Sequence, residues 1–220
     1  MTHTFDNEYW DQIWQGDRAG SMASGRPNPH LAREVADLLP ATALDAGCGA
    51  GAEAIWLAEH RWQVTAADIA SAALDRAAER AAAAGVAERI EWVRADLSVW
   101  EPGRQYDLVT THYAHPAMPQ LEFYDRIAAW VAPGGTLLVV GHLHHDATDG
   151  HGHGHGHDNR PPASASATAA AVTARLDPAA WEVVSAEESE RTLPGHGGRE
   201  VTLHDVVVRA TRRLVSKAAR

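Results

Sequence analysis

The segment LDAGCGAG, residues 44–51, decides the fold of this 220-residue chain. It lies between an apolar run at 42–46 and an alanine-rich run of helical period at 52–59, which makes it a turn from a strand into a helix. Glycines at 47, 49 and 51 let the backbone turn tightly and approach a ligand, and the following helix presents unpaired N–H groups at its start. The turn therefore predicts a site for a nucleotide-like ligand, although a dinucleotide fingerprint and a purely structural turn fit the same residues.

From residue 42 onward, short apolar runs alternate with alanine-rich segments of helical period, which is typical of a parallel sheet covered by helices. Strands are expected near residues 42–46, 63–67, 89–94, 106–111 and 135–141, and helices at 52–59, 72–84 and 121–131. Ser71 is expected to cap the second of these helices, and Gly85 to follow its end. Pro133–Gly135 is expected to form the turn that starts the fifth strand.

Two further strand-like runs, residues 181–186 and 200–210, follow a short alanine-rich helix that ends near Leu176. Only a loop joins them, whereas a parallel return needs a crossover of a dozen or more residues, so they should pair antiparallel. The predicted fold class is α/β, with a Rossmann-like doubly wound, mostly parallel sheet and an antiparallel C-terminal hairpin.

We expect a single domain over residues 1–220. Its parts are an N-terminal cap (1–40), a ligand-binding core (41–141), a flexible His/Gly-rich loop (142–168) and a C-terminal helix and hairpin (169–220). The cap contains a helix near residues 30–39, and Trp10, Trp14 and His30 are expected to fold over the ligand.

Acidic residues end the second and third strands. Asp68 comes about 20 residues after the glycine turn, where a carboxylate can accept both hydrogen bonds of a ribose diol. Asp96 suits an exocyclic adenine amine, with Ile69 and Leu97 as apolar walls for the ring. Each acid could instead cap a helix. However, the glycine turn after the first strand and the acids after the second and third strands lie in register, which favours a nucleotide ligand.

Over residues 40–142 the chain resembles the class I S-adenosylmethionine-dependent methyltransferases. The resemblance rests on the acidic glycine turn at 45–51, ADI at 67–69, DL at 96–97, YDLVTTH at 106–112 and PGGTL at 133–137. It implies the seven-stranded methyltransferase fold, S-adenosyl-L-methionine as cofactor and a small-molecule methyl acceptor. Asp45 would then lie beside the methionine amino group of the cofactor. The implied cofactor-binding residues are Asp45, Gly47, Gly49, Gly51, Asp68, Ile69, Asp96, Leu97 and His112.

A narrower resemblance covers the N-terminal segment. Trp10 and Trp14, followed by GRPNPHL at 25–31, look like the corresponding segment of the thiopurine and tellurite-resistance methyltransferases. This branch implies a soft S, Se or Te acceptor. The alternatives are an O- or N-methyltransferase of a small metabolite, and a metal-binding or metal-responsive protein on the same fold without turnover.

Two histidines are candidate catalytic residues. His112 and His115 follow the fourth strand at the carboxyl edge of the sheet, where a ligand of this architecture binds. A histidine there can orient or deprotonate a hydroxyl or amine, whereas a thiolate or chalcogen anion attacks unaided. The alternative is a loop histidine bonded to backbone. Cys48, inside the glycine turn, is either an acidified thiol at a helix N-terminus or a buried, inert residue; we favour the inert interpretation.

The amino-acid composition disfavours several classes of partner. Lys and Arg number 19 against 29 Asp and Glu, a net charge of −10, which disfavours nucleic acid. The single cysteine excludes an internal disulfide framework and fits a cytoplasmic protein. No apolar run approaches the roughly 18 to 20 residues of a membrane span, so no membrane partner is expected.

Seven of the 14 histidines lie between residues 142 and 157. Repeated Gly-His predicts weak transition-metal binding, but ordering such a loop is costly and no second shell of ligands is visible. We assign no metal site and expect the repeat to be incidental. His142 and His144 differ from the others, since they follow the fifth strand and could line the substrate pocket.

Overall fold

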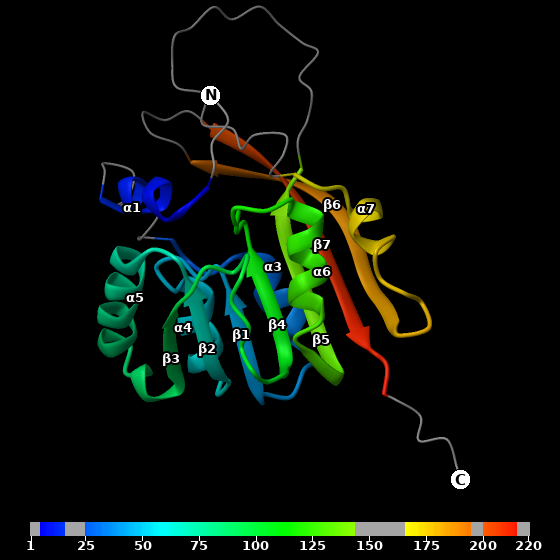
Figure 1. Ribbon diagram of the computed structural model, residues 1–220, viewed down its shortest axis with the longest axis horizontal. Helices are drawn as coiled ribbons and strands as arrows, with labels where there is room; N and C mark the ends of the chain where they lie inside the picture. Colours follow the sequence, from blue (N-terminus) through cyan, green and yellow to red (C-terminus); the bar gives the residue numbers. More distant parts are fainter. Residues whose placement is uncertain (1–4, 16–24, 144–165, 195–199, 215–220) are drawn as a thin grey trace, which may run out of the picture.

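The computed structural model describes residues 5–15, 25–143, 166–194 and 200–214. Within these ranges a seven-stranded sheet has the order β3-β2-β1-β4-β5-β7-β6 (Figure 1). The strands are β1 (Thr42–Ala46), β2 (Gln63–Asp68), β3 (Ile90–Arg94), β4 (Tyr106–His112), β5 (Val131–His142), β6 (Trp181–Pro194) and β7 (Glu200–Arg212). The helices are α1 (Asn7–Gln15), α3 (Pro29–Val35), α4 (Ala52–Glu59), α5 (Ser71–Ala83), α6 (Gln120–Ala128) and α7 (Ala169–Thr173), with a 3-10 turn η1 (Ala87–Arg89).

Strands β1 to β5 pair in parallel, whereas β7 pairs antiparallel with both β5 and β6. The predicted fold class, a mostly parallel doubly wound sheet with an antiparallel hairpin, is confirmed. The chain order reverses between β1 and β4, and in such sheets a ligand binds at the carboxyl ends of the strands on either side of that reversal.

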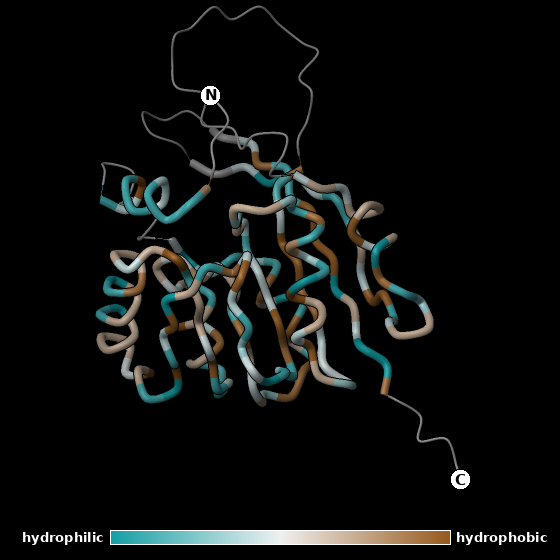
Figure 2. Tube along the Cα trace, in the orientation of Figure 1, coloured by the Kyte–Doolittle hydropathy of each residue, from teal (hydrophilic) through white to brown (hydrophobic). Residues whose placement is uncertain are grey.

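Apolar side chains cover both faces of the sheet, and hydrophobic residues run along its central strands (Figure 2). On one face, α3, α4 and α5 pack over residues such as Leu138 and Val207. On the other face, α6 and α7 pack over residues such as Leu137 and Val208. Neighbouring residues of one strand thus point into opposite hydrophobic cores. Since both faces of β5 are buried, its sequence is a continuous apolar run.

Several boundaries differ from the sequence prediction. Ser71 is the first residue of α5 rather than its cap; the N-cap is Ala70, whose N–H donates to Oδ1 of Asp68 at 2.9 Å. The helix predicted at 30–39 ends at Val35. Strand β6 continues eight residues beyond the predicted end at 186, because the neighbouring β7 supplies partners along its whole length.

Pro133–Gly135 is not the turn that precedes β5 but an irregularity inside it. Val131 already pairs with Tyr106, and the register then shifts so that Thr136 pairs with Leu108. A Cβ on Gly135 would lie 2.9 Å from the carbonyl oxygens of Ala132 and Asp107, so only glycine fits this close approach.

Over the described residues, no helix combines the length and the apolar character needed to cross a bilayer.

Candidate active site

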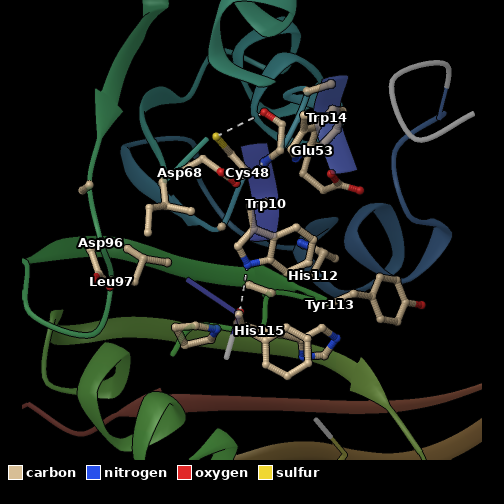
Figure 3. Close-up of a pocket in the computed structure, with 18 of the residues that line it drawn as sticks. Trp10, Trp14, Cys48, Glu53, Asp68, Asp96, Leu97, His112, Tyr113 and His115 are labelled. Atoms are coloured by element: carbon tan, nitrogen blue, oxygen red, sulfur yellow. Dashed lines mark hydrogen bonds between the residues drawn. The ribbon is translucent and has the colours of Figure 1, made fainter. Parts of the chain in front are cut away.

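A cavity of about 280 Å³ lies at the carboxyl edge of the sheet, under α1 (Figure 3). The glycine turn, the ends of β2 and β4 and the loop after β3 contribute to its wall. It brings together most of the predicted site residues, namely Gly47, Gly49, Asp68, Ile69, Asp96, Leu97, His112 and His115. Asp45 and Gly51 are outside its lining.

The three glycines of the turn are required by close contacts with neighbouring side chains as well as by the cavity. Gly47, Gly49 and Gly51 all have positive φ. A Cβ on Gly47 would lie 2.2 Å from the Cβ of Ala114, and one on Gly51 would lie 2.6 Å from the ring of Trp92. Gly47 therefore lets the loop after β4 close over the turn, whereas Gly51 serves the packing of α4 and not the cavity wall.

Asp68 is fixed by the chain itself. Its Oδ2 accepts from the Gly49 N–H at 2.8 Å, and its Oδ1 accepts from the Ala70 N–H at 2.9 Å. Burial raises its pKa, and these two backbone hydrogen bonds oppose that rise. Each oxygen retains a second lone pair, so the fixed carboxylate can still accept from a pair of hydroxyls.

Asp45 lies beneath the turn, 1% exposed, and its Oδ2 has no hydrogen-bond partner among the described residues. Burial raises its pKa well above the usual range, and the nearby carboxylates of Glu53 and Asp68 add to the rise. A cationic group in the cavity would relieve this concentration of negative charge.

Glu53 is a cavity residue that the sequence reasoning missed. It lies in the first turn of α4 and accepts a hydrogen bond from the Asn28 N–H at 3.0 Å. The signal was present, because an acidic residue in the first turn of the helix after the glycine turn must lie near the ligand end of that helix.

Asp96 stabilises the turn that follows it and also lines the cavity, so its contact with adenine stays a prediction. Its Oδ1 accepts from the N–H of Ser98 at 2.9 Å and from the Ser98 hydroxyl at 2.6 Å, which is a local cap. The same residue also lines the cavity beside Leu97, with Ile69 completing the apolar wall.

His112, the last residue of β4, lines the cavity and carries a buried polar atom without a partner. Its Nε2 is buried without a hydrogen-bond partner in the described part of the chain, and its Nδ1 is 3.4 Å from the Thr110 hydroxyl. Burial lowers the pKa of His112, so its imidazole is neutral at physiological pH. A neutral ring with an unused nitrogen can accept or donate one hydrogen bond to a bound molecule.

His115 is held on two sides. Its Nδ1 hydrogen-bonds to Oε1 of Gln120 at 3.2 Å, and its carbonyl accepts from the Trp10 indole at 3.3 Å (Figure 3). Burial lowers its pKa as well. The indole bond joins α1 to the loop after β4 and so fixes the roof of the cavity.

The remaining predicted residues are distributed as follows. Trp10 and Trp14 line the cavity, as expected for a cap, but His30 is turned away to Asp205, 3.2 Å from its carboxylate. His142 is outside the lining and stacks between the rings of Tyr113 and His115, with centroids at 4.4 Å and 5.4 Å.

Burial raises the pKa of the Cys48 thiol, which agrees with the inert interpretation. Among the described residues no group of three His, Cys, Asp or Glu side chains is arranged to hold a metal ion. The Gly-His repeat, with His144, lies outside the described residues, so its metal binding stays a prediction.

The seven-stranded sheet matches the expected Rossmann-like methyltransferase fold, and an acid lies at or next to the carboxyl end of each of its first three strands. Residues 43–135 match the family described as "Methyltransferase domain", and this part of the chain is an S-adenosylmethionine-dependent methyltransferase domain. The residues present fit that cofactor, because the unpartnered buried carboxylate of Asp45 suits its cationic end and the bare glycine turn leaves room for it.

The curated relatives are methyltransferases. A trans-aconitate 2-methyltransferase from Streptomyces avermitilis is 35% identical over 123 residues, which are 49% of this chain and 45% of that protein. Thiocyanate methyltransferase 1 from Arabidopsis thaliana is 26% identical over 90% of this chain and 83% of its own length. Apart from the latter, the curated relatives are matched over only 33–60% of their own lengths.

Solved structures share the fold. One, from work on the conversion of a disulfide bond into a thioacetal group during echinomycin biosynthesis, has a TM-score of 0.69 at 20% identity and covers 98% of this chain and 94% of its own. TehB from Haemophilus influenzae has a TM-score of 0.66 at 14% identity and covers 94% of this chain and 66% of its own.

Proposed function

We propose that the protein transfers a methyl group from S-adenosylmethionine to a small acceptor with a soft reacting atom, and that the acceptor is a thiol. The observation that carries the proposal is that a neutral His112, whose Nε2 has no partner among the described residues, lines a cavity with aromatic side chains in its wall. Two of the matched proteins support a soft acceptor by name, thiocyanate methyltransferase 1 and a probable thiol methyltransferase 2 from Arabidopsis thaliana.

The positions of four acidic residues support a placement of the cofactor at one end of the cavity. Asp68 would accept the ribose hydroxyls, Asp96 would accept the adenine amine, and Ile69 and Leu97 would sandwich the ring. Asp45 and Glu53 would face the methionine amino group. When bound, the cofactor supplies the methyl group as part of a sulfonium, which loses its positive charge on transfer.

The chain's own contribution is alignment and exclusion of water. Trp10 and Trp14 cover the cavity from α1, and the Trp10 indole fixes that helix to the carbonyl of His115. The rigid loop after β4 then holds the acceptor in line with the carbon under attack.

The protonation state of His112 selects the acceptor. Because burial lowers the pKa of His112, its imidazole is unprotonated at neutral pH but is a weak base. A thiol, with a pKa of about 8.5, is more acidic than a phenol or an aliphatic hydroxyl, so it gives up its proton to a weak general base most readily, and the resulting thiolate is a strong nucleophile. The proton would end on Nε2 of His112, and the thiolate lone pair would form the new S–C bond while the bond between the methyl carbon and the sulfonium sulfur breaks. The cofactor would then leave as the neutral thioether S-adenosylhomocysteine. An aliphatic hydroxyl is far too weak an acid for the same base.

A second candidate is O- or N-methylation of a small metabolite. The same His112 nitrogen favours it, because a base at that position can also serve an acidic hydroxyl such as a phenol. The two candidates differ in the element of the acceptor and not in the cofactor.

The test compares the methylation rates of a thiol and a hydroxyl compound of similar shape, and then of other acceptors. Transfer from labelled S-adenosylmethionine is measured to benzenethiol and phenol, and then to selenite, tellurite and amines. We expect benzenethiol to be methylated at least tenfold faster than phenol. Faster methylation of phenol or of an amine would overturn the thiol assignment in favour of the second candidate.

We also propose a cytoplasmic enzyme without a nucleic-acid partner. The net charge of −10 and the single cysteine support both statements.

A further inference from the structure

The loop after β4 carries two cavity histidines on either side of a tyrosine with unusual backbone geometry. Tyr113 has φ of +55°, in the left-handed region that a bulky residue rarely adopts and that strains the backbone. It directly follows His112 and lies two residues before His115. Something outside the loop must hold this conformation.

The Tyr113 side chain ends in a buried polar cluster, which we call the Asp205 cluster: Asn28, His30, Tyr113, Arg191 and Asp205. The Tyr113 hydroxyl donates to Oδ1 of Asp205 at 2.7 Å. It accepts from Nη2 of Arg191 at 2.8 Å and from Nδ2 of Asn28 at 3.0 Å. Asp205 is fully buried, and its Oδ2 is also bonded by Arg191 and by Nε2 of His30.

The hydroxyl is therefore saturated, with one donated and two accepted hydrogen bonds. Burial raises the pKa of Tyr113, and the adjacent Asp205 carboxylate adds to the rise, so the hydroxyl stays protonated at any physiological pH. It acts as a fixed donor and has no role as a base. Its partners come from the start of α3, from β6 and from β7, so three elements meet at this one oxygen.

The cluster also reaches the cofactor end of the cavity. The Asn28 side chain bonds the Tyr113 hydroxyl, while the Asn28 N–H donates to Glu53 on the cavity wall. The Tyr113 N–H continues the pairing of β4 with β5 by donating to the Val140 carbonyl at 2.9 Å. The turn at Tyr113 is thus fixed at its backbone and at the far end of its ring.

We propose that Tyr113 is a positioning residue of the transfer site: the Asp205 cluster, acting through the Tyr113 hydroxyl, holds the left-handed turn that keeps the His112 ring in the cavity wall. The link to turnover rests on the proposed function, whereas the effect on the placement of His112 does not.

The test removes one oxygen. Tyr113→Phe keeps the ring and its stacking on His142 but leaves Asp205 Oδ1 and the donors of Asn28 and Arg191 without this partner. Tyr106→Phe is the matched control, because Tyr106 is a buried tyrosine at the opposite end of the same strand, next to Arg104.

The first readout needs no acceptor. The His112 imidazole is titrated by NMR, with its signal identified by its loss in His112→Asn. The charged and titratable groups that influence His112 are Glu53 and His30. In Tyr113→Phe we expect the pKa of His112 to rise toward its ordinary value as the ring gains solvent, and in Tyr106→Phe we expect no change.

The second readout is kinetic. We expect Tyr113→Phe to lower kcat about tenfold, equivalent to about 1.4 kcal/mol of barrier, while the Kd for S-adenosylhomocysteine changes less than twofold. Asn28→Ser is a milder variant that keeps a residue suited to cap α3 and removes one donor to Tyr113; it should move both readouts in the same direction by less.

An unchanged His112 titration in Tyr113→Phe, or an equal shift in Tyr106→Phe, would overturn the proposal. A titration that shifts in a protein that methylates no thiol would leave the positioning role intact and count against the proposed function alone.

Discussion

Two backbone N–H groups hold the Asp68 carboxylate in one orientation in the cavity wall. Because Gly49 and Ala70 fix both oxygens, no reorganisation is needed when a diol arrives. Asp68→Ala should weaken S-adenosylhomocysteine binding by about 2–3 kcal/mol through loss of charge-assisted hydrogen bonds. Calorimetry measures this, with Asp75→Ala on the exposed face of α5 as the control. Unchanged affinity in Asp68→Ala would remove Asp68 from the site.

Replacing a glycine can cost stability through backbone strain and through a steric collision of the new Cβ. Comparison of Gly47 with Gly85 distinguishes these two effects. Both have positive φ, +84° and +72°, but a Cβ on Gly47 would collide with Ala114, whereas one on Gly85 would meet nothing within 4 Å. Gly85→Ala should therefore cost about 1 kcal/mol of backbone strain in unfolding free energy.

Gly47→Ala should cost clearly more than Gly85→Ala in urea unfolding, and should also reduce cofactor binding because the loop carrying His112 is displaced. Equal destabilisation of the two variants would show that the loop yields without cost.

Sequence reasoning correctly placed at the cavity those residues whose position depends on following a strand, such as Asp68 and Asp96. It missed Glu53 and misjudged His30, because both depend on which helix face meets which neighbour. The Asp205 cluster was beyond it for a further reason: its members are separated by up to 177 positions, from Asn28 to Asp205, and no local pattern connects them.

Helix α1 covers the cavity through few contacts. Trp10 bonds the His115 carbonyl, and Trp14 packs beside Gly49, 3.1 Å from where a Cβ on that glycine would lie. A bound ligand would add contacts to this helix, so amide exchange over residues 7–15 should slow when S-adenosylhomocysteine is added.

Helix α7 serves as the control for that measurement, since it packs mainly on β6 and β7, and its exchange should not change. If protection of α1 does not increase, the cap does not close on the cofactor.

At the scale of elements, the sequence located the strands and helices of the core well because their apolar periods are local. The element boundaries that were predicted wrongly depend on contacts with neighbouring strands. β6 is extended by its pairing with β7, and Gly135 in β5 lies against the carbonyl oxygens of Tyr106 and Asp107 in β4. Pairing of this kind is a property of the sheet and not of the segment.

Stability of the whole molecule should depend on pH through its buried histidines. Burial lowers the pKa of His142 to about 4, and the neighbouring His115 contributes. Since the unfolded chain then binds more protons than the native one below about pH 6.5, this group costs stability as the pH falls through that window. Asp45 and Asp68, whose pKa values are raised, act in the opposite direction.

The variant His142→Gln isolates the histidine contribution. Its free energy of unfolding, measured relative to that of the parent, should increase by about 3 kcal/mol between pH 7 and pH 4, because the variant lacks the group that destabilises the parent. Urea titrations at several pH values measure this difference. A constant difference across the range would show that His142 is not held neutral.

The position of β7 between β5 and β6 has a consequence for synthesis on the ribosome. Strands β1 to β5 emerge in an order that lets each join its neighbours, but the outer edge of β5 must wait for the last strand of the sheet. Until then, the apolar residues Leu137–Val140 border a row of unpaired backbone groups, a template for pairing between nascent chains. β6, although made earlier, cannot shield this edge, because its own partner in the sheet is β7. The final strand thus closes the interval in which a newly made chain is most prone to aggregate, and it brings Asp205 to the turn at Tyr113 in the same event.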